Sequence, residues 1–191
     1  TDGLEEVFKA FAEQLGITRN AEYLKELFKE GYINHNNLAS ATRYIANKLF
    51  ATYGLVIIDG DDAKLKRIFS PLVEKELLEQ VSYKAVTDTI SELEQNYKVQ
   101  VNPREINLFY LSENSRERII KEGDTFVVNN TSISWKEEEI IKEVDEFPER
   151  FSPNVIMRPL YQEVVLPNLA YIGGGGELAY WLELKAYFET V

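Results

Sequence analysis

Leu55-Val56-Ile57-Ile58-Asp59 is a short run of branched apolar residues that follows Gly54 directly and ends at a carboxylate. An uninterrupted apolar run of this length is typical of a strand that is buried on both faces of a parallel sheet. The stretch from residue 61 to residue 77 begins with acidic residues and continues with apolar residues at three- and four-residue spacing, which predicts an amphipathic helix. A buried strand followed at once by a helix indicates an α/β fold.

Later parts of the chain repeat this alternation of strand and helix. An amphipathic run at residues 82–97 precedes two β-prone runs, at residues 99–101 and 106–111. A further β-prone run, Leu169-Ala170-Tyr171-Ile172, is followed by four glycines and then by helical spacing at residues 177–188. We therefore predict that these runs belong to one partial, mostly parallel sheet.

Two stretches differ from this core. Residues 1–54 have helical spacing in three segments, which predicts a helical N-terminal segment. Residues 112–150 have short β-prone runs separated by turn dipeptides, followed by a helical pattern, which predicts an inserted lobe with a small antiparallel β-meander and a helix. The predicted divisions are the helical segment 1–54, the first core part 55–111, the inserted lobe 112–150 and the second core part 151–191.

The composition excludes several classes of protein. Acidic residues outnumber basic residues by 32 to 21, and the net charge of −11 argues against nucleic acid as a partner, because phosphate binding needs clustered cations. The chain has no cysteine, so it has no disulfide, zinc-thiolate site or thiol nucleophile, and we predict no metal site. No apolar run approaches the roughly 20 residues of a membrane span, so we expect no membrane partner and a cytoplasmic location.

Gly173-Gly174-Gly175-Gly176 lies between a predicted strand and a predicted helix. A backbone without side chains can adopt a positive φ and approach a ligand closely, and the free amides at a helix start attract anions. The stretch therefore predicts an anion- or nucleotide-binding loop, and Gly174, Gly176 and Ala179 match the G-x-G-x-x-A dinucleotide pattern. The alternative is a turn that packs a helix onto a sheet, with Glu177 complementing the helix dipole.

Asn154, Arg158 and Gln162 are spaced four residues apart. On a helix these positions share one face, and an Asn-Arg-Gln face suits a carboxylate, a phosphate or a sugar. The alternative is a solvated face on which Arg158 pairs with a local acid. We predict Asn154, Arg158, Gln162 and Glu177 as substrate-binding residues, and we leave the catalytic residues unassigned.

Several motifs of this chain occur in the order in which one enzyme family has them. They are residues 53–59, 61–69, 104–111, 148–155, 158–163, 166–167 and 170–181. On these motifs the chain resembles the cysteine ligases of bacillithiol biosynthesis, the cysteine-adding enzymes. The resemblance runs from about Leu38 to the C-terminus. One position departs from the family, whose members usually have proline where Gly175 stands.

The resemblance implies a Rossmann-like core in an enzyme that joins cysteine to glucosaminyl-malate. It also implies that the chain is an internal fragment, inactive by itself, of a longer protein that ends in a coiled coil. The identity of the cofactor is left open, with ATP or ADP and Mg²⁺ as candidates. A homo-oligomer is possible as the oligomeric state. Two other hypotheses stand beside this one: a stand-alone nucleotide- or anion-binding α/β module, and an acidic interaction domain.

Overall fold

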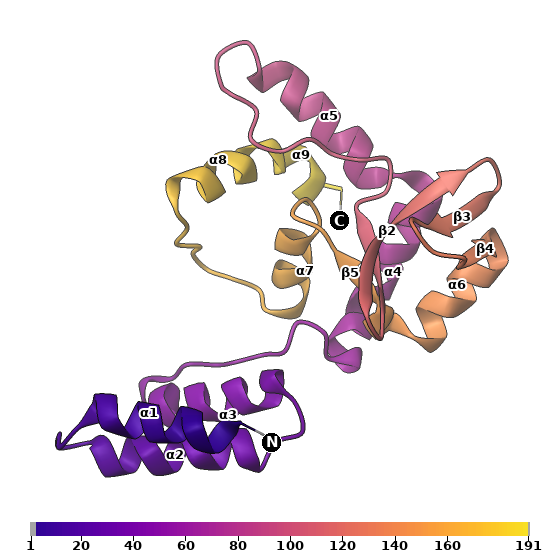
Figure 1. Ribbon diagram of the computed structural model, residues 1–191. Helices are drawn as coiled ribbons and strands as arrows, with labels where there is room; N and C mark the ends of the chain where they lie inside the picture. Colours follow the sequence, from indigo (N-terminus) through magenta and orange to yellow (C-terminus); the bar gives the residue numbers. More distant parts are fainter. Residues whose placement is uncertain (1–2, 191) are drawn as a thin grey trace. The chain divides into compact units, whose positions relative to one another are not determined.

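The computed structural model describes residues 3–190, and the chain divides into two compact units, Thr1–Asp59 and Gly60–Val191. We call them the helical unit and the sheet unit and describe each by itself (Figure 1). Within residues 3–190, no helix is both long enough and apolar enough to cross a membrane.

The helical unit confirms the predicted helical N-terminal segment. Its elements are α1 (Leu4–Leu15), α2 (Ala21–Ile33), α3 (Leu38–Phe50) and the 3₁₀ turn η1 (Ala51–Tyr53). Asn37 caps α3, because its Oδ1 accepts a hydrogen bond from the Ser40 amide at 2.8 Å. Gly31 of α2 lies so close to α3 that a Cβ built on it would be 2.6 Å from Cγ1 of Ile45. The absence of a side chain at Gly31 therefore allows α2 and α3 to pack closely.

The sheet unit contains five strands in the order β4-β3-β2-β1-β5, and each neighbouring pair is antiparallel. The strands are β1 (Leu108–Ser112), β2 (Ser115–Glu122), β3 (Thr125–Val128), β4 (Ser134–Lys136) and β5 (Phe151–Pro153). Strands β1 to β4 form a meander, in which Phe109 pairs with Arg118 and Ile120 with Val127. The predicted antiparallel meander is therefore present, and β5 extends it on the β1 edge.

The other described elements of the sheet unit are helical (Figure 1). They are α4 (Ala63–Glu79), α5 (Val81–Leu93), α6 (Glu137–Glu146), the 3₁₀ turn η2 (Pro148–Arg150), α7 (Arg158–Val165), α8 (Gly175–Glu183) and α9 (Lys185–Phe188). Asp62 begins α4 by accepting hydrogen bonds from the amides of Lys64 and Leu65. The core of the unit is formed by Phe69 and Leu77 of α4 with Phe126 of β3 and other buried apolar residues.

The prediction of a mostly parallel sheet is wrong. In the part of the chain that the structure describes, the only sheet is the antiparallel one, and residues 55–59, 99–101 and 169–172 lie outside any strand. Val56 is 71% exposed and Ile172 is 97% exposed, so these apolar runs are not the buried strands that their composition indicated. The meander strands find partners a few residues away through short turns, whereas a parallel strand needs a distant partner. Strands β2, β3 and β4 of this sheet come from the stretch predicted as the inserted lobe, whereas β1 and β5 come from the flanking stretches.

A buried polar cluster joins α4, α5 and the start of β1. The carboxylate of Glu76, which is 1% exposed, accepts hydrogen bonds from the amide and hydroxyl of Ser82 and from the amide of Asn107. The side-chain amide of Asn107 donates to Oγ of Ser82 at 2.7 Å. Several donors therefore compensate the desolvation of this carboxylate.

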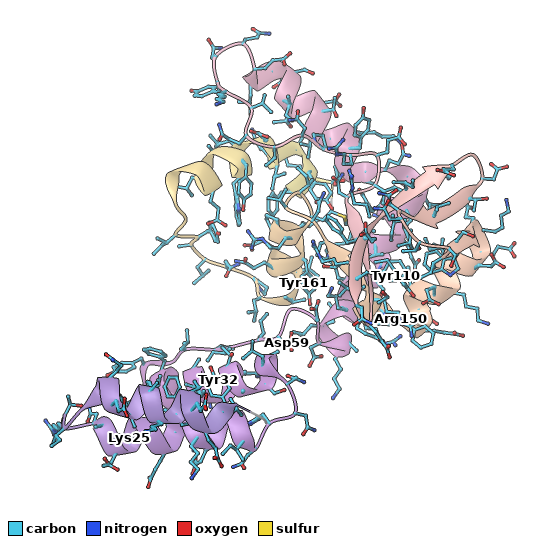
Figure 2. All side chains as sticks on the ribbon, in the orientation of Figure 1. Lys25, Tyr32, Asp59, Tyr110, Arg150 and Tyr161 are labelled. Carbon is cyan, nitrogen blue, oxygen red and sulfur yellow. The ribbon has the colours of Figure 1, made fainter. Side chains whose placement is uncertain are left out.

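A second polar group lies where β1 meets α6 and η2, and Figure 2 shows Tyr110 and Arg150 side by side there. The Tyr110 hydroxyl donates to Oε1 of Glu143 at 2.5 Å, and Nη1 of Arg150 donates to the same carboxylate oxygen at 2.8 Å. Burial, and then the hydrogen bond to Glu143, raise the pKa of Tyr110 to about 12.

Candidate functional site

Arg158 is the first residue of α7, and its guanidinium connects α7 with α8. Nη1 donates to Oε1 of Gln162 at 3.2 Å, one helical turn away. Nη2 donates to Oε1 of Glu177 at 3.0 Å and to the hydroxyl of Tyr180 at 2.9 Å. Proline at the next position, Pro159, does not break α7, because a residue in the first helical turn needs no intrahelical amide donor.

Glu177 lies in the first turn of α8 and collects hydrogen bonds from several side chains. The Tyr180 hydroxyl donates to its Oε1 at 3.0 Å. Hydrogen bonds from Tyr171 and Tyr180, together with the charge of Arg158, lower the pKa of Glu177. The bond to Glu177 in turn raises the pKa of the Tyr171 hydroxyl. Glu177 is therefore a stable carboxylate that two phenols and a guanidinium hold in place.

The guanidinium of Arg158 is partly buried, yet it stays charged. Partial burial lowers its pKa, but hydrogen bonds to Tyr180 and Tyr171 outweigh that effect and raise the pKa overall. Its side chain is 42% exposed and that of Glu177 is 33% exposed. Both charges are therefore paired with each other and still accessible to a ligand.

Asn154 does not share the face of Arg158 and Gln162, because α7 begins four residues later. Its Oδ1 accepts hydrogen bonds from the amides of Ile156 and Met157, and its Nδ2 donates to Asn107 at 2.8 Å. The structure thus brings Arg158, Gln162 and Glu177 together, while Asn154 holds the turn that leads into α7.

The helix α8 begins within the four glycines, two residues before the predicted start of the helix at residue 177. Gly174 is the N-cap residue, with φ −67° and ψ 158°, and Gly175 and Gly176 form the first turn. None of the four has a positive φ, so the left-handed conformation that glycine allows is not used. A Cβ on Gly173 would lie 2.8 Å from Cε1 of Tyr171, but one on Gly174, Gly175 or Gly176 would meet nothing within 4 Å. The start of α8 is therefore open.

Aromatic residues that the sequence analysis did not single out complete the cluster. Tyr171 stacks on Trp181 with ring centroids 4.0 Å apart and an interplanar angle of 12°. Tyr180 and Trp181 follow Glu177 by three and four residues, a helical spacing that could have indicated their common face. We use the name Arg158 cluster for Arg158, Gln162, Tyr171, Glu177, Tyr180 and Trp181.

A magnesium nucleotide does not fit the Arg158 cluster well. A polyphosphate at the start of α8 would meet the carboxylate of Glu177, whose Oε2 lies only 3.3 Å from the Cβ position of Gly173. Within residues 3–190, no group of three or more His, Cys, Asp or Glu side chains is placed to hold a metal ion. One guanidinium beside one carboxylate is better suited to a ligand of low net charge.

Comparisons with known proteins give a consistent result. Residues 1–191 match the family described as "Bacillithiol biosynthesis BshC, N-terminal Rossmann-like domain". A protein of Flavobacterium johnsoniae is 60% identical over 191 residues, which are 100% of this chain and 36% of that protein. A protein of Christiangramia forsetii is 56% identical over the same shares, and one of Bacillus cereus strain B4264 is 31% identical over 98% of this chain and 35% of its own length. All three carry the name "Putative cysteine ligase BshC". The chain thus spans about a third of the length of these relatives.

Proposed function

The chain belongs to the family of the N-terminal Rossmann-like domain of the bacillithiol biosynthesis protein BshC, and on this premise we propose that it is part of an enzyme that joins cysteine to glucosaminyl-malate. The observation that carries the proposal is the 60% identity, over the whole chain, to a relative named as a cysteine ligase. We also propose that the substrates are small molecules and that the protein is cytoplasmic. The division of the chain into two core parts and an inserted lobe is part of this proposal.

Within this enzyme, we assign the Arg158 cluster to substrate binding. A ligase must hold an amine beside a carboxyl group, which requires oriented polar contacts. Arg158 supplies a fixed cation, and Gln162 and Tyr180 hold its guanidinium plane. Three of the four glycines, Gly174 to Gly176, leave the neighbouring backbone uncovered. We also assign an anion-binding role to the backbone amides of Gly173, Gly174, Gly175 and Gly176, for a single carboxylate group rather than a polyphosphate, because the carboxylate of Glu177 lies beside them.

The experiment uses the full-length protein, with purified glucosaminyl-malate, cysteine and each candidate nucleotide. Product formation is followed by mass spectrometry, as the mass of the two substrates joined with loss of water. Wild-type protein should form this product. If it forms none under any of these conditions, the proposed activity is overturned.

Arg158→Ala tests the assignment of the site. Loss of a charged hydrogen bond to substrate costs about 1.5–3 kcal/mol, which corresponds to a fall in kcat/KM of roughly 10- to 150-fold. Arg67→Ala is the matched control, because Arg67 also pairs with a carboxylate, Asp145, but on α4 and α6. Both variants are compared by thermal unfolding, so that a loss of fold is recognised. Equal kinetics for wild type and Arg158→Ala would remove Arg158 from the site.

A further inference from the structure

We infer that the Arg158–Glu177 pair receives the zwitterionic head group of a free α-amino acid, with Arg158 binding the carboxylate and Glu177 binding the ammonium group. This inference rests on the proposed function and deepens it, because it assigns the Arg158 cluster to cysteine rather than to glucosaminyl-malate.

The first argument is the geometry of the two charges. An α-amino acid has a carboxylate and an ammonium group on one carbon atom, so its receptor needs an anion and a cation side by side. Nη2 of Arg158 and Oε1 of Glu177 lie 3.0 Å apart, and both side chains are partly exposed. Each group also has polar atoms beyond this contact, namely Nε of Arg158 and Oε2 of Glu177.

The second argument is charge balance. A zwitterion brings one charge of each sign, so it can replace the Arg158–Glu177 contact by two new ion pairs without adding net charge. The malate group of the other substrate brings two carboxylates, and the carboxylate of Glu177 would repel one of them. An overall charge of −11 adds to this preference. The pair thus favours the amino acid over the acidic sugar derivative.

The third argument is that neighbouring groups hold both charges in position. Tyr180 accepts a hydrogen bond from Arg158 at 2.9 Å and donates one to Glu177 at 3.0 Å. The site is therefore ordered before a ligand arrives, and less of the binding free energy is lost in fixing side chains. Tyr171, stacked on Trp181, places an aromatic surface beside the pair, and such surfaces make favourable contacts with sulfur.

The test measures KM separately for the two substrates of the full-length protein. Glu177→Gln removes the negative charge and keeps the shape, and Arg158→Ala removes the positive charge. Each should raise KM for cysteine at least tenfold and leave KM for glucosaminyl-malate within twofold. The control variants Arg67→Ala and Asp145→Asn break an ion pair of the same kind between α4 and α6, and they should change neither constant.

Two cysteine analogues separate the two charges. Cysteamine has no carboxylate and 3-mercaptopropionate has no ammonium group. In calorimetric titrations, Glu177→Gln should weaken the binding of cysteamine and leave that of 3-mercaptopropionate unchanged or stronger, whereas Arg158→Ala should show the opposite pattern. Because binding is measured directly, this pattern does not depend on turnover.

The inference is overturned if the Arg158 and Glu177 variants raise KM for glucosaminyl-malate and not for cysteine, a result that leaves the proposed function intact. It is also overturned if both variants bind cysteine as wild type does. Failure of wild-type protein to form the joined product overturns the proposed function instead, so the two failures are distinguishable. A variant whose melting temperature falls is replaced by Arg158→Lys or Glu177→Asp. The inference then requires that KM for cysteine rises more than KM for glucosaminyl-malate.

Discussion

The side-chain amide of Asn154 donates a hydrogen bond to Oδ1 of Asn107 at 2.8 Å, across 47 residues of sequence. The backbone amide of Asn154 also donates to the carbonyl of Asn107, at 3.0 Å. Asn107 itself contacts the buried carboxylate of Glu76. The turn that leads into α7, and with it Arg158, is thus connected to the buried polar cluster of Glu76, Ser82 and Asn107.

Asn107→Ala should destabilise the protein by about 2–3 kcal/mol, because it leaves buried donors and acceptors without partners. Asn107 is fully buried, and its side chain contacts Ser82, Arg104 and Asn154. Urea denaturation of the full-length protein measures this change. Asn96→Ala, at an exposed position, should alter the free energy of unfolding by less than about 0.5 kcal/mol. Equal effects of the two substitutions would contradict the structural role of Asn107.

The stability of the protein should decrease as the pH rises above about 10. The folded pKa of Tyr110, about 12, is higher than the ordinary value of 10, so the folded state retains a proton that the unfolded state loses. The contribution of Tyr110 to the free energy of unfolding is complete below pH 10 and is lost as the pH approaches 12. Burial raises the pKa of Tyr187 as well, so this residue adds to the effect.

Denaturation curves measured at intervals from pH 8 to alkaline pH check this prediction. One tyrosine contributes a slope of at most about 1.4 kcal/mol per pH unit. Tyr110→Phe should reduce the slope without abolishing it, because the folded state still retains the Tyr187 proton that the unfolded state loses. An unchanged slope in Tyr110→Phe would show that Tyr110 has no such role.

Gly31→Ala should lower the stability of the helical unit, although alanine normally stabilises a helix by about 1 kcal/mol relative to glycine. The new Cβ would lie 2.6 Å from Cγ1 and 2.7 Å from Cδ1 of Ile45. Overpacking of this kind costs about 1–3 kcal/mol. A melting temperature above that of wild type would contradict the close packing of α2 and α3.

Ile45→Ala supplies the matching control for Gly31→Ala. Alone, it should destabilise by about 2–4 kcal/mol, because it removes a buried side chain. In the double variant the two changes should compensate partly, with a coupling free energy of about 1–2 kcal/mol. Simple additivity in this double-mutant cycle would show that the two residues do not clash.

Local signals made the helices and the meander predictable. Asp62 precedes the apolar spacing of α4 and does cap it, and Gly123 lies in the turn between β2 and β3 with φ of 59°. Such signals act over a few residues, so they can be recognised without knowledge of the remaining fold.

The sheet could not be predicted to the same extent, because a strand exists only beside a partner. The apolar runs at 55–59 and 169–172 have strand composition, but their sequence does not specify which distant segment would pair with them. In the described structure both runs are outside the sheet. The family to which the chain belongs is nevertheless described as a Rossmann-like domain.

The candidate site was predictable only in part, because the sequence indicates contacts between residues one helical turn apart but not contacts between distant residues. Helical spacing placed Gln162 one turn after Arg158, and their 3.2 Å hydrogen bond agrees with it. The contacts of Arg158 with Glu177 and Tyr180 join residues 19 and 22 positions apart, for which the sequence has no short-range signal. The four-residue spacing predicts one helical face for Asn154, Arg158 and Gln162, but α7 begins at Arg158, so Asn154 lies outside the helix.

Gly175→Pro should stabilise the start of α8 by about 0.4–1 kcal/mol, because proline restricts the unfolded chain. Gly175 is the first helical residue, where proline is favoured, and Gly174 before it has ψ of 158°, which suits a residue preceding proline. Proline also removes one amide donor, whereas Gly175→Ala keeps it, so the two variants form a matched pair. If the Gly175 amide binds an anionic group of a substrate, Gly175→Pro should raise both the melting temperature and the KM for that substrate. Gly175→Ala should leave this KM unchanged. An unchanged KM in both variants would exclude that amide from the site, and a lower melting temperature for Gly175→Pro would contradict the described start of α8.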